Sequence, residues 1–150
     1  MAQMPETLWQ SECLVIGFGR IGKLLSARLH RLGAVVTVAV RKQADQALIA
    51  AFGMQYDSLP QYRRPLSQYR LIVNTVPAPI FTPEQYAQLD PECVLIDLAS
   101  SPGGIDASQC LKHHLNFTHA RGLPGKASPA TAGQLIAEAV QRAFAQKEAL

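Results

Sequence analysis

The stretch that decides the fold reads Cys13-Leu-Val-Ile-Gly17-Phe-Gly19-Arg-Ile-Gly22. Its first four residues are apolar, which is typical of a strand buried on both faces of a sheet, and we predict a strand over residues 13–17. The three glycines have the spacing GxGxxG, and an amphipathic helix is predicted directly after them, over residues 20–32. A strand, a glycine turn and a helix in this order favour a turn that binds a diphosphate.

Each glycine has its own role in such a turn. Gly17 allows the chain to turn tightly, Gly19 lets a pyrophosphate approach the backbone, and Gly22 lets the helix pack close to the sheet. The first N–H groups of the helix have no partners within the helix and carry a partial positive charge, to which Arg20 adds a full charge. The alternative is a structural glycine turn without a ligand.

Strands and helices alternate along the rest of the chain. Further strands are predicted over residues 34–40, 71–76, 93–98 and 116–120, with a short strand and loops within residues 54–69. Further helices are predicted over residues 44–52, from a capping box at residues 82–85, from 106 to 114 and from 128 to 147. Right-handed crossovers between strands at this spacing require a parallel sheet.

The predicted fold class is therefore α/β. We expect a Rossmann-type doubly wound parallel sheet of about six strands, with helices on both faces. It forms a single domain over residues 13–147, between a leader (residues 1–12) and a tail (residues 148–150).

The end of the second predicted strand bears on the choice of cofactor. Domains that bind NAD usually have Asp or Glu at this strand end, which accepts a hydrogen bond from the 2′-hydroxyl of the adenosine ribose. Here the strand ends in Val40 and is followed by Arg41 and Lys42. Two cations attract a 2′-phosphate, so we expect NADP(H) rather than NAD(H). The alternative is that both cations belong to a solvated turn.

Polar and glycine-rich loops follow the later strands, at the edge where such sheets bind ligands. Asn74 lies where the nicotinamide half of the cofactor is expected, and Asp97 is either a base or a structural hydrogen-bond acceptor. The residues predicted to bind the cofactor are Gly17, Phe18, Gly19, Arg20, Ile21, Gly22, Arg41, Lys42, Asn74, Thr75, Val76, Pro77, Leu98 and Ala99. The residues predicted to face a substrate are Ser100, Ser101, Gly103, Gly104, Gly122, Leu123, Pro124 and Lys126. No residue is assigned a catalytic or metal-binding role.

Composition limits the class of protein. With 150 residues, of which 48% are hydrophobic and 17% charged, the chain has the composition of one soluble globular domain. The net charge of +3 is not concentrated in a basic block, so we do not expect nucleic acid as a partner. No membrane span or secretory signal is visible. Cys13, Cys93 and Cys110 form no CxxC pair, which fits a reducing compartment, and we expect a cytoplasmic protein.

Four motifs in this order are similar to those of a known family. They are Leu14-Val-Ile-Gly-Phe-Gly-Arg20, Asn74-Thr-Val-Pro77, Ile96-Asp-Leu-Ala-Ser100 with Pro102-Gly-Gly104, and Gly122-Leu-Pro-Gly-Lys126 through Thr131-Ala-Gly133. The chain resembles the C-terminal nucleotide-binding domain of the dipicolinate synthase family, in its A subunits. The two later loops are the more specific part of this resemblance, because many dehydrogenases share the glycine turn.

The resemblance implies an NADP-dependent oxidoreductase of dipicolinate biosynthesis during sporulation. It implies that a dihydrodipicolinate-type precursor, a small dicarboxylate, is oxidised to dipicolinate with hydride transfer to NADP. It also implies two partners, an N-terminal catalytic domain and a second, flavoprotein-like subunit. Only a short leader precedes the domain here, so the chain is either an excised domain or a natural short relative. Arg121 stands where an apolar residue or proline is expected, which bears on substrate choice.

Two other functions stay open. One is a non-catalytic module that senses NADP(H) or docks a partner, which an exposed apolar patch near Trp9, Phe81 or Phe117 would favour. The other is the cofactor domain of another two-domain dehydrogenase, of the methylenetetrahydrofolate or 2-hydroxyacid type. Because no acid–base pair is complete, we expect the isolated chain to lack dehydrogenase activity. The sequence leaves open whether the chain forms a homo-oligomer.

Overall fold

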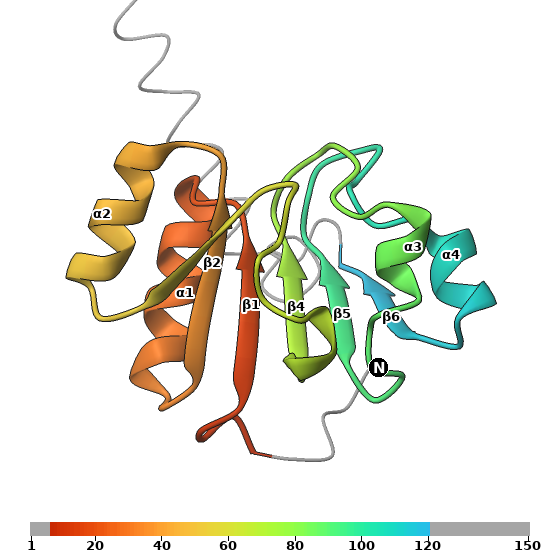
Figure 1. Ribbon diagram of the computed structural model, residues 1–150, viewed down its shortest axis with the longest axis horizontal. Helices are drawn as coiled ribbons and strands as arrows, with labels where there is room; N and C mark the ends of the chain where they lie inside the picture. The colour runs from red at the N-terminus through yellow and green to blue at the C-terminus, as the bar shows by residue number, and fades with distance from the viewer. Residues whose placement is uncertain (1–6, 121–150) are drawn as a thin grey trace, which may run out of the picture. The chain divides into compact units, whose positions relative to one another are not determined.

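The computed structural model describes residues 7–120 of the 150-residue chain (Figure 1). Six strands in this range form one parallel sheet, in the order β3-β2-β1-β4-β5-β6. The strands are β1 (Glu12–Ile16), β2 (Val35–Val40), β3 (Gln55–Ser58), β4 (Leu71–Asn74), β5 (Val94–Asp97) and β6 (Asn116–His119). The chain builds the sheet from β1 to one edge, returns to the middle, and then builds the other half. The predicted doubly wound parallel sheet is therefore confirmed.

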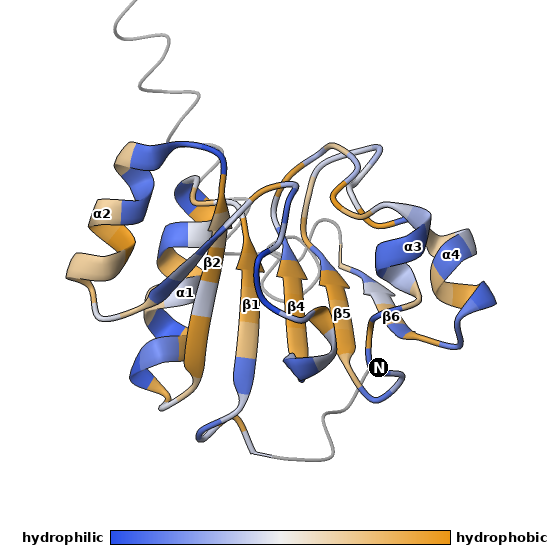
Figure 2. Ribbon diagram, viewed as in Figure 1, coloured by the Kyte–Doolittle hydropathy of each residue, from blue (hydrophilic) through white to orange (hydrophobic). Residues whose placement is uncertain are grey.

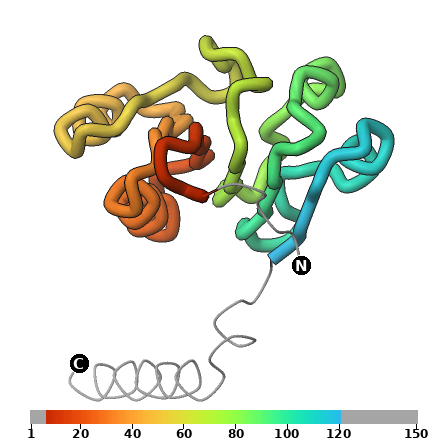
Figure 3. Tube along the Cα trace, turned by 90° about the horizontal axis from the view of Figure 1, so that it is seen from below, coloured from red at the N-terminus to blue at the C-terminus, as the bar shows by residue number. Residues whose placement is uncertain are grey.

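Helices connect the strands and lie on both faces of the sheet. They are α1 (Arg20–Arg31), α2 (Gln43–Ala51), α3 (Pro83–Tyr86) and α4 (Ala107–Lys112), with a short 3-10 turn, η1 (Leu66–Gln68), before β4. In the view along the strands, α1 and α3 lie on opposite sides of the sheet (Figure 3). The carboxyl ends of the strands point to the top of Figure 1, so the loops that follow the strands share one edge of the sheet.

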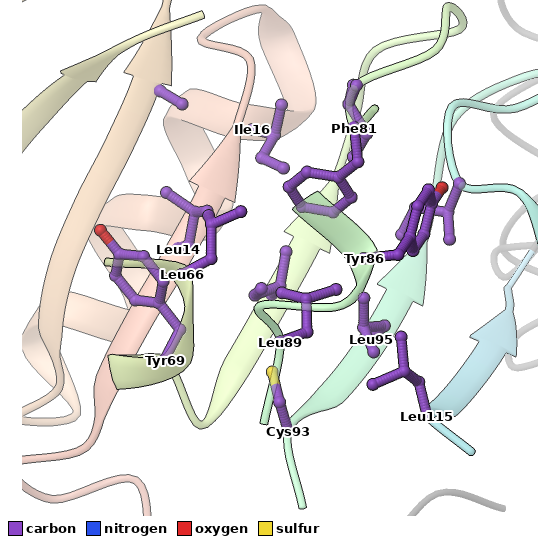
Figure 4. Close-up of a cluster of buried hydrophobic side chains, with 14 of the residues drawn as sticks. Leu14, Ile16, Leu66, Tyr69, Phe81, Tyr86, Leu89, Cys93, Leu95 and Leu115 are labelled. Carbon is purple, nitrogen blue, oxygen red and sulfur yellow. The ribbon is translucent and has the colours of Figure 1, made fainter. Parts of the chain in front are cut away.

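The side chains of the central strand alternate between two buried clusters. Cys13 and Val15 pack in the cluster that includes residues of α1 and α2, whereas Leu14 and Ile16 pack with residues of η1, α3 and α4 (Figure 4). All four side chains are fully buried, as expected for a strand in the middle of a parallel sheet. Figure 2 shows the central strands β1, β2, β4 and β5 as mainly hydrophobic, while the edge strands β3 and β6 and the helices carry many hydrophilic residues.

Most predicted elements agree with the structure to within one residue at each end. The prediction for β4 is too long, because the strand ends at Asn74 and not at residue 76. The side chain of Asn74 hydrogen-bonds to both the N–H and the carbonyl of Val76, which turns the chain away from the sheet.

The prediction for α4 is also too long. Asp106 caps this helix as expected, because its side chain accepts hydrogen bonds from two backbone N–H groups. The helix ends at Lys112 and not at residue 114. His114 takes a left-handed φ of 54°, and the N–H of Leu115 closes the end of the helix on the carbonyl of Cys110 at 2.9 Å.

The three aromatic side chains considered for a docking patch differ in exposure. Phe81 is buried between Tyr62 and Tyr86, with ring centroids 5.4 Å apart in both pairs, so it is not part of an exposed patch. Phe117 is half-buried. Trp9 is exposed on one side and covers Gly33 on the other, where a Cβ atom would overlap the indole ring.

All three cysteines are buried free thiols. Burial raises the pKa of Cys13 to about 11 and the pKa values of Cys93 and Cys110 to about 12. All three thiols therefore stay protonated at neutral pH. Cys13 and Cys93 are members of the two hydrophobic clusters, so they are core residues.

Several predictions concern residues outside the range 7–120. They are the helix over residues 128–147, Arg121, and the substrate-facing Gly122, Leu123, Pro124 and Lys126. The extent of the single domain to residue 147 likewise stays a prediction. Within the part of the chain that the structure describes, no helix is both long and apolar enough to span a bilayer.

Candidate nucleotide-binding site

The glycine turn after β1 is packed so tightly that two of its glycines cannot be replaced without movement. Gly17 has a φ of +96°, and a Cβ atom there would lie 2.6 Å from Oγ1 of Thr75. A Cβ atom at Gly22 would overlap the carbonyl oxygen of Gly17. The first turn of α1 therefore rests directly on the loop, and the residue after β4 supports it from the other side.

Gly19 differs from both, because packing does not require a glycine there. Its backbone is extended, with φ −75° and ψ −166°, and a Cβ atom would meet nothing within 4 Å. Gly19 is the N-cap of α1, with no side-chain cap, and the first turn contains no acidic residue. The N–H groups at the start of α1 thus face space that an anion can fill.

Two cations lie at the same end of α1. Arg20 begins the helix and is exposed, and Nζ of Lys23 lies 5.2 Å from the centroid of the Phe18 ring. A helix dipole disfavours positive side chains in the first turn. A bound anion would make the arrangement favourable, because both the dipole and the two cations attract it.

A cavity of about 290 Å³ extends from the glycine turn to the end of β2. It brings together residues from four segments that are far apart in the sequence. It is lined by Gly17, Phe18, Gly19, Ala39, Val40, Arg41, Lys42, Asp45, Leu59 and Val76. Predicted diphosphate residues and predicted ribose residues therefore share one cavity at the carboxyl edge of the sheet.

Positively charged side chains outnumber negatively charged ones in this cavity. Arg41 and Lys42 are exposed, and within residues 7–120 neither of them forms an ion pair. Asp45, half-buried in the first turn of α2, is an acidic residue that the sequence analysis missed. Asp45 could have been recognised from its position in the sequence, because it follows the second predicted strand and lies at the start of the next predicted helix. The cavity thus has two cations and one anion at the end of β2.

At the other end of the site, Asp97 is fully buried. Its Oδ1 accepts hydrogen bonds from Nδ2 of Asn74 at 2.9 Å and from the N–H of Ala99 at 3.0 Å. Its Oδ2 accepts from the N–H of Gly104 at 2.8 Å and from the N–H of Ile105 at 3.1 Å. With four donors around it, the carboxylate is a structural acceptor, which decides between the two roles considered for it.

The loops after β4 and β5 contact each other at Gly103 and Gly104, two of the predicted substrate-facing glycines. Gly103 has a φ of +93°, and a Cβ atom there would lie 2.7 Å from Oδ2 of Asp97 and 3.0 Å from Cε1 of His119. A Cβ atom at Gly104 would lie 2.5 Å from Nδ2 of Asn74 and 2.6 Å from the carbonyl oxygen of Val76. Close packing accounts for both glycines, and a contact with substrate stays a prediction.

The remaining residues predicted at this end have different surroundings. Thr75 is tied to β1, because its Oγ1 and its N–H both donate to the carbonyl of Ile16, at 2.8 and 2.9 Å. The N–H of Leu98 donates to the carbonyl of Asn74 at 2.9 Å, and Ala99 is buried. Pro77, Ser100 and Ser101 are exposed and do not line the cavity at the glycine turn.

A second cavity, of about 260 Å³, lies between the loops after β4 and β5 and the helices that follow them. Gly103 and Gly104 line it together with Phe81, Tyr86 and other residues of these loops. The structure therefore places Gly103 and Gly104 at a different cavity from the glycine turn.

A parallel sheet of this order, with an open glycine turn at its middle, defines a Rossmann-like domain that resembles the NAD(P) domains of dehydrogenases. The chain is homologous to the A subunit of dipicolinate synthase. It is 31% identical to the protein of Bacillus subtilis (strain 168) over 143 residues, which are 95% of this chain and 48% of that protein. The chain thus spans about half the length of the curated relative it matches. No family model matches the chain.

Solved structures agree with this relationship. The crystal structure of the dipicolinate synthase A chain from Bacillus subtilis has a TM-score of 0.91 and 30% identity, covering 97% of this chain and 49% of that chain. CAD from Helicobacter pylori, complexed with NADP(H), has a TM-score of 0.63 and 15% identity, covering 75% of this chain and 34% of that chain. At this identity the second likeness shows the fold alone.

Proposed function

We propose that the chain binds NADP(H) in preference to NAD(H) and is the nucleotide-binding half of an oxidoreductase related to the A subunit of dipicolinate synthase. One observation carries this proposal. A single cavity joins the open glycine turn at Gly19 to two cations, Arg41 and Lys42, that form no ion pair within residues 7–120.

The diphosphate belongs at the start of α1. The space beside Gly19 lets phosphate oxygens reach the backbone, and the uncapped N–H groups of the first turn donate to them. Arg20 and Lys23 add positive charge at the same place, so a bound diphosphate offsets the repulsion between these cations and the helix dipole.

The adenosine ribose belongs at the end of β2. A 2′-phosphate there accepts charge-assisted hydrogen bonds from Arg41 and Lys42, whereas a ribose without the phosphate leaves both cations without an anion. Asp45 acts in the opposite direction, because its carboxylate repels a phosphate and accepts from a hydroxyl. Two cations against one anion favour NADP(H), and the preference is smaller than the cations alone would give.

The reaction follows from the homology and is a proposal for the whole enzyme. The dicarboxylate precursor loses a hydride to NADP and a proton to a base, and its ring becomes aromatic. This chain matches about half of its relative, so the substrate cleft needs a second domain, and the flavoprotein-like subunit is a proposed partner. Because the buried Asp97 has four hydrogen-bond donors, it does not serve as the base. We therefore expect the chain to bind cofactor without turnover when alone.

Titration calorimetry with NADPH and NADH tests this proposal. We expect the wild-type chain to bind NADPH several-fold more tightly than NADH, and Arg41→Asp to abolish the preference. Arg28→Asp is the matched control, since it makes the same change of charge in the last turn of α1, at the other end of the helix, and should leave the preference intact. Equal affinity of the wild-type chain for both nucleotides would overturn the ribose argument, and binding of neither would overturn the proposed function.

A non-catalytic module that senses NADP(H) is the second candidate. Two features favour it: a cavity brings the predicted cofactor residues together at the glycine turn, and the one carboxylate considered as a base, Asp97, is enclosed by hydrogen-bond donors. The two candidates differ in one measurement. Oxidation of a dihydrodipicolinate-type precursor after addition of the other half of a dipicolinate synthase A subunit supports the enzyme, whereas no oxidation supports the sensor.

A further inference from the structure

We propose that Asp97 is a positioning residue for the nicotinamide half of the cofactor, an inference that rests on the nucleotide binding proposed above. Asp97 is fully buried at the end of β5, so it acts through the loops around it and not by touching the cofactor. The nicotinamide half is expected beyond the middle of the sheet, over the ends of β4 and β5. The Asp97 carboxylate connects the loops that follow these two strands through hydrogen bonds.

The carboxylate connects three backbone segments. Its Oδ1 accepts from the side chain of Asn74 at the end of β4 and from the N–H of Ala99 directly after β5. Its Oδ2 accepts from the N–H groups of Gly104 and Ile105, which lie just before α4. The loop from residue 98 to residue 105 is thus closed on one side chain, and that side chain is linked to β4.

Asn74 extends this link into the loop after β4. Its Nδ2 donates both to Asp97 and to the carbonyl of Val76, and its Oδ1 accepts from the N–H of Val76, each at 2.9 Å. Because a carboxylate accepts only, Asp97 requires the nitrogen of this amide to face it, which fixes the orientation of the Asn74 side chain. Val76 also lines the cavity at the glycine turn. It therefore lies between the proposed diphosphate site and the loops that Asp97 holds.

Substitution of Asp97 by Asn tests this arrangement with almost no change of volume. All four groups that surround the carboxylate are donors, and an amide would present one acceptor and one further donor to them. Two donors would then face each other on one side of residue 97. We expect the loops after β4 and β5 to separate locally, and the glycine turn and the end of β2 to keep their structure.

Asp57 provides a matched control on the other half of the sheet. It is 3% exposed and holds the loop after β3 in a similar way, since its carboxylate accepts from the backbone N–H groups of Ser58, Arg63 and Arg64. Asp57→Asn therefore makes the same chemical change at a buried carboxylate near a strand end. Its strand is at the opposite edge of the sheet from β5 and β6, on the adenosine side.

The experiment compares two probes by titration calorimetry, NADPH and adenosine 2′,5′-bisphosphate, which carries the adenosine end without the nicotinamide half. For Asp97→Asn we expect NADPH to bind about tenfold more weakly, while adenosine 2′,5′-bisphosphate stays within about twofold of its wild-type affinity. For Asp57→Asn we expect the ratio of the two dissociation constants to stay within about twofold of the wild-type ratio. The emission of bound NADPH, which reports the surroundings of the dihydronicotinamide ring, should change for Asp97→Asn only.

The outcomes separate the two proposals. If the wild-type chain binds neither probe, nucleotide binding itself is overturned. If the wild-type chain binds both probes but Asp97→Asn weakens both equally, or neither, the positioning role is overturned and nucleotide binding stands. If circular dichroism shows that Asp97→Asn does not fold, Asn74→Ala decides the question. It removes the link to β4 and leaves three backbone donors on Asp97, and the same selective loss of NADPH binding is expected.

Discussion

The same added methyl group should have opposite consequences at Gly19 and Gly22. At Gly19 the backbone is one that any residue adopts, and a Cβ atom meets nothing within 4 Å. Alanine caps a helix less well than glycine but restricts the unfolded chain more, so Gly19→Ala should change the free energy of unfolding by less than about 1 kcal/mol. At Gly22 a Cβ atom would overlap the carbonyl oxygen of Gly17 and lie 2.9 Å from its carbonyl carbon, where ordinary contacts begin at 3.4 Å.

The magnitude at Gly22 follows from this overlap. Overpacking costs about 1–3 kcal/mol, and we place Gly22→Ala at the upper end because the neighbour is backbone and not a flexible side chain. Alanine returns about 1 kcal/mol through its better helix propensity. The expected net loss is about 2 kcal/mol in the free energy of unfolding.

Urea unfolding followed by circular dichroism, together with NADPH titration, measures both effects. Gly19→Ala should fold like the wild-type chain but bind NADPH at least about tenfold more weakly, because its methyl group occupies the space assigned to the diphosphate. Gly22→Ala should lose stability and binding together. Wild-type NADPH affinity in folded Gly19→Ala would refute the placement of the diphosphate, and wild-type stability of Gly22→Ala would refute the packing argument.

Three further predictions concern charge and protonation. Asp45→Asn should tighten NADPH binding by about twofold to fivefold, because it removes a half-exposed anion beside the proposed position of the 2′-phosphate. If the substitution weakens NADH binding and does not tighten NADPH binding, the carboxylate instead accepts from a ribose hydroxyl. Burial raises the pKa of Cys13 to about 11 and those of Cys93 and Cys110 to about 12, so an aromatic disulfide reagent at pH 8 should label these thiols only after unfolding. Unfolded thiols lose their protons near their ordinary pKa of 9, whereas the buried thiols of the folded chain keep theirs. The free energy of unfolding should therefore fall as the pH rises above about 9, and the stability that the protonated thiols contribute should be lost above about pH 12. Labelling of the folded chain within minutes at pH 8 would contradict the burial of the thiols.

The sequence predicted the sheet because the relevant signals are local. The apolar residues of β1, the glycines of the turn and the helical spacing in α1 all lie within a few residues of one another. Their order along the chain then fixes the sheet topology through the handedness of the crossovers. The helix starts at Thr82 and Asp106 were recognisable for the same reason, because their capping bonds are local. Oε1 of Gln85 accepts from the N–H of Thr82, and Oδ1 of Asp106 accepts from the N–H groups of Ser108 and Gln109, all within three residues.

The features that the sequence did not predict depend on distant partners. The end of β4 at Asn74 depends on an amide whose orientation is fixed by Asp97, which is 23 positions away. No local pattern distinguishes a carboxylate with four buried donors from a catalytic base, so both roles were open until the donors were placed. Gly103 and Gly104 likewise have the composition of a ligand loop, but contacts with Asn74 and Asp97 account for them.

The contrast between the two ends of the candidate site has a consequence for how such a domain can evolve. Arg41 and Lys42 are exposed, so they can be replaced without disturbing the core. Asp97 is hydrogen-bonded to two loops and to a neighbouring strand, so its replacement disturbs all three. Under the cofactor placement proposed above, single substitutions can therefore change the coenzyme preference more easily than the position of the nicotinamide ring.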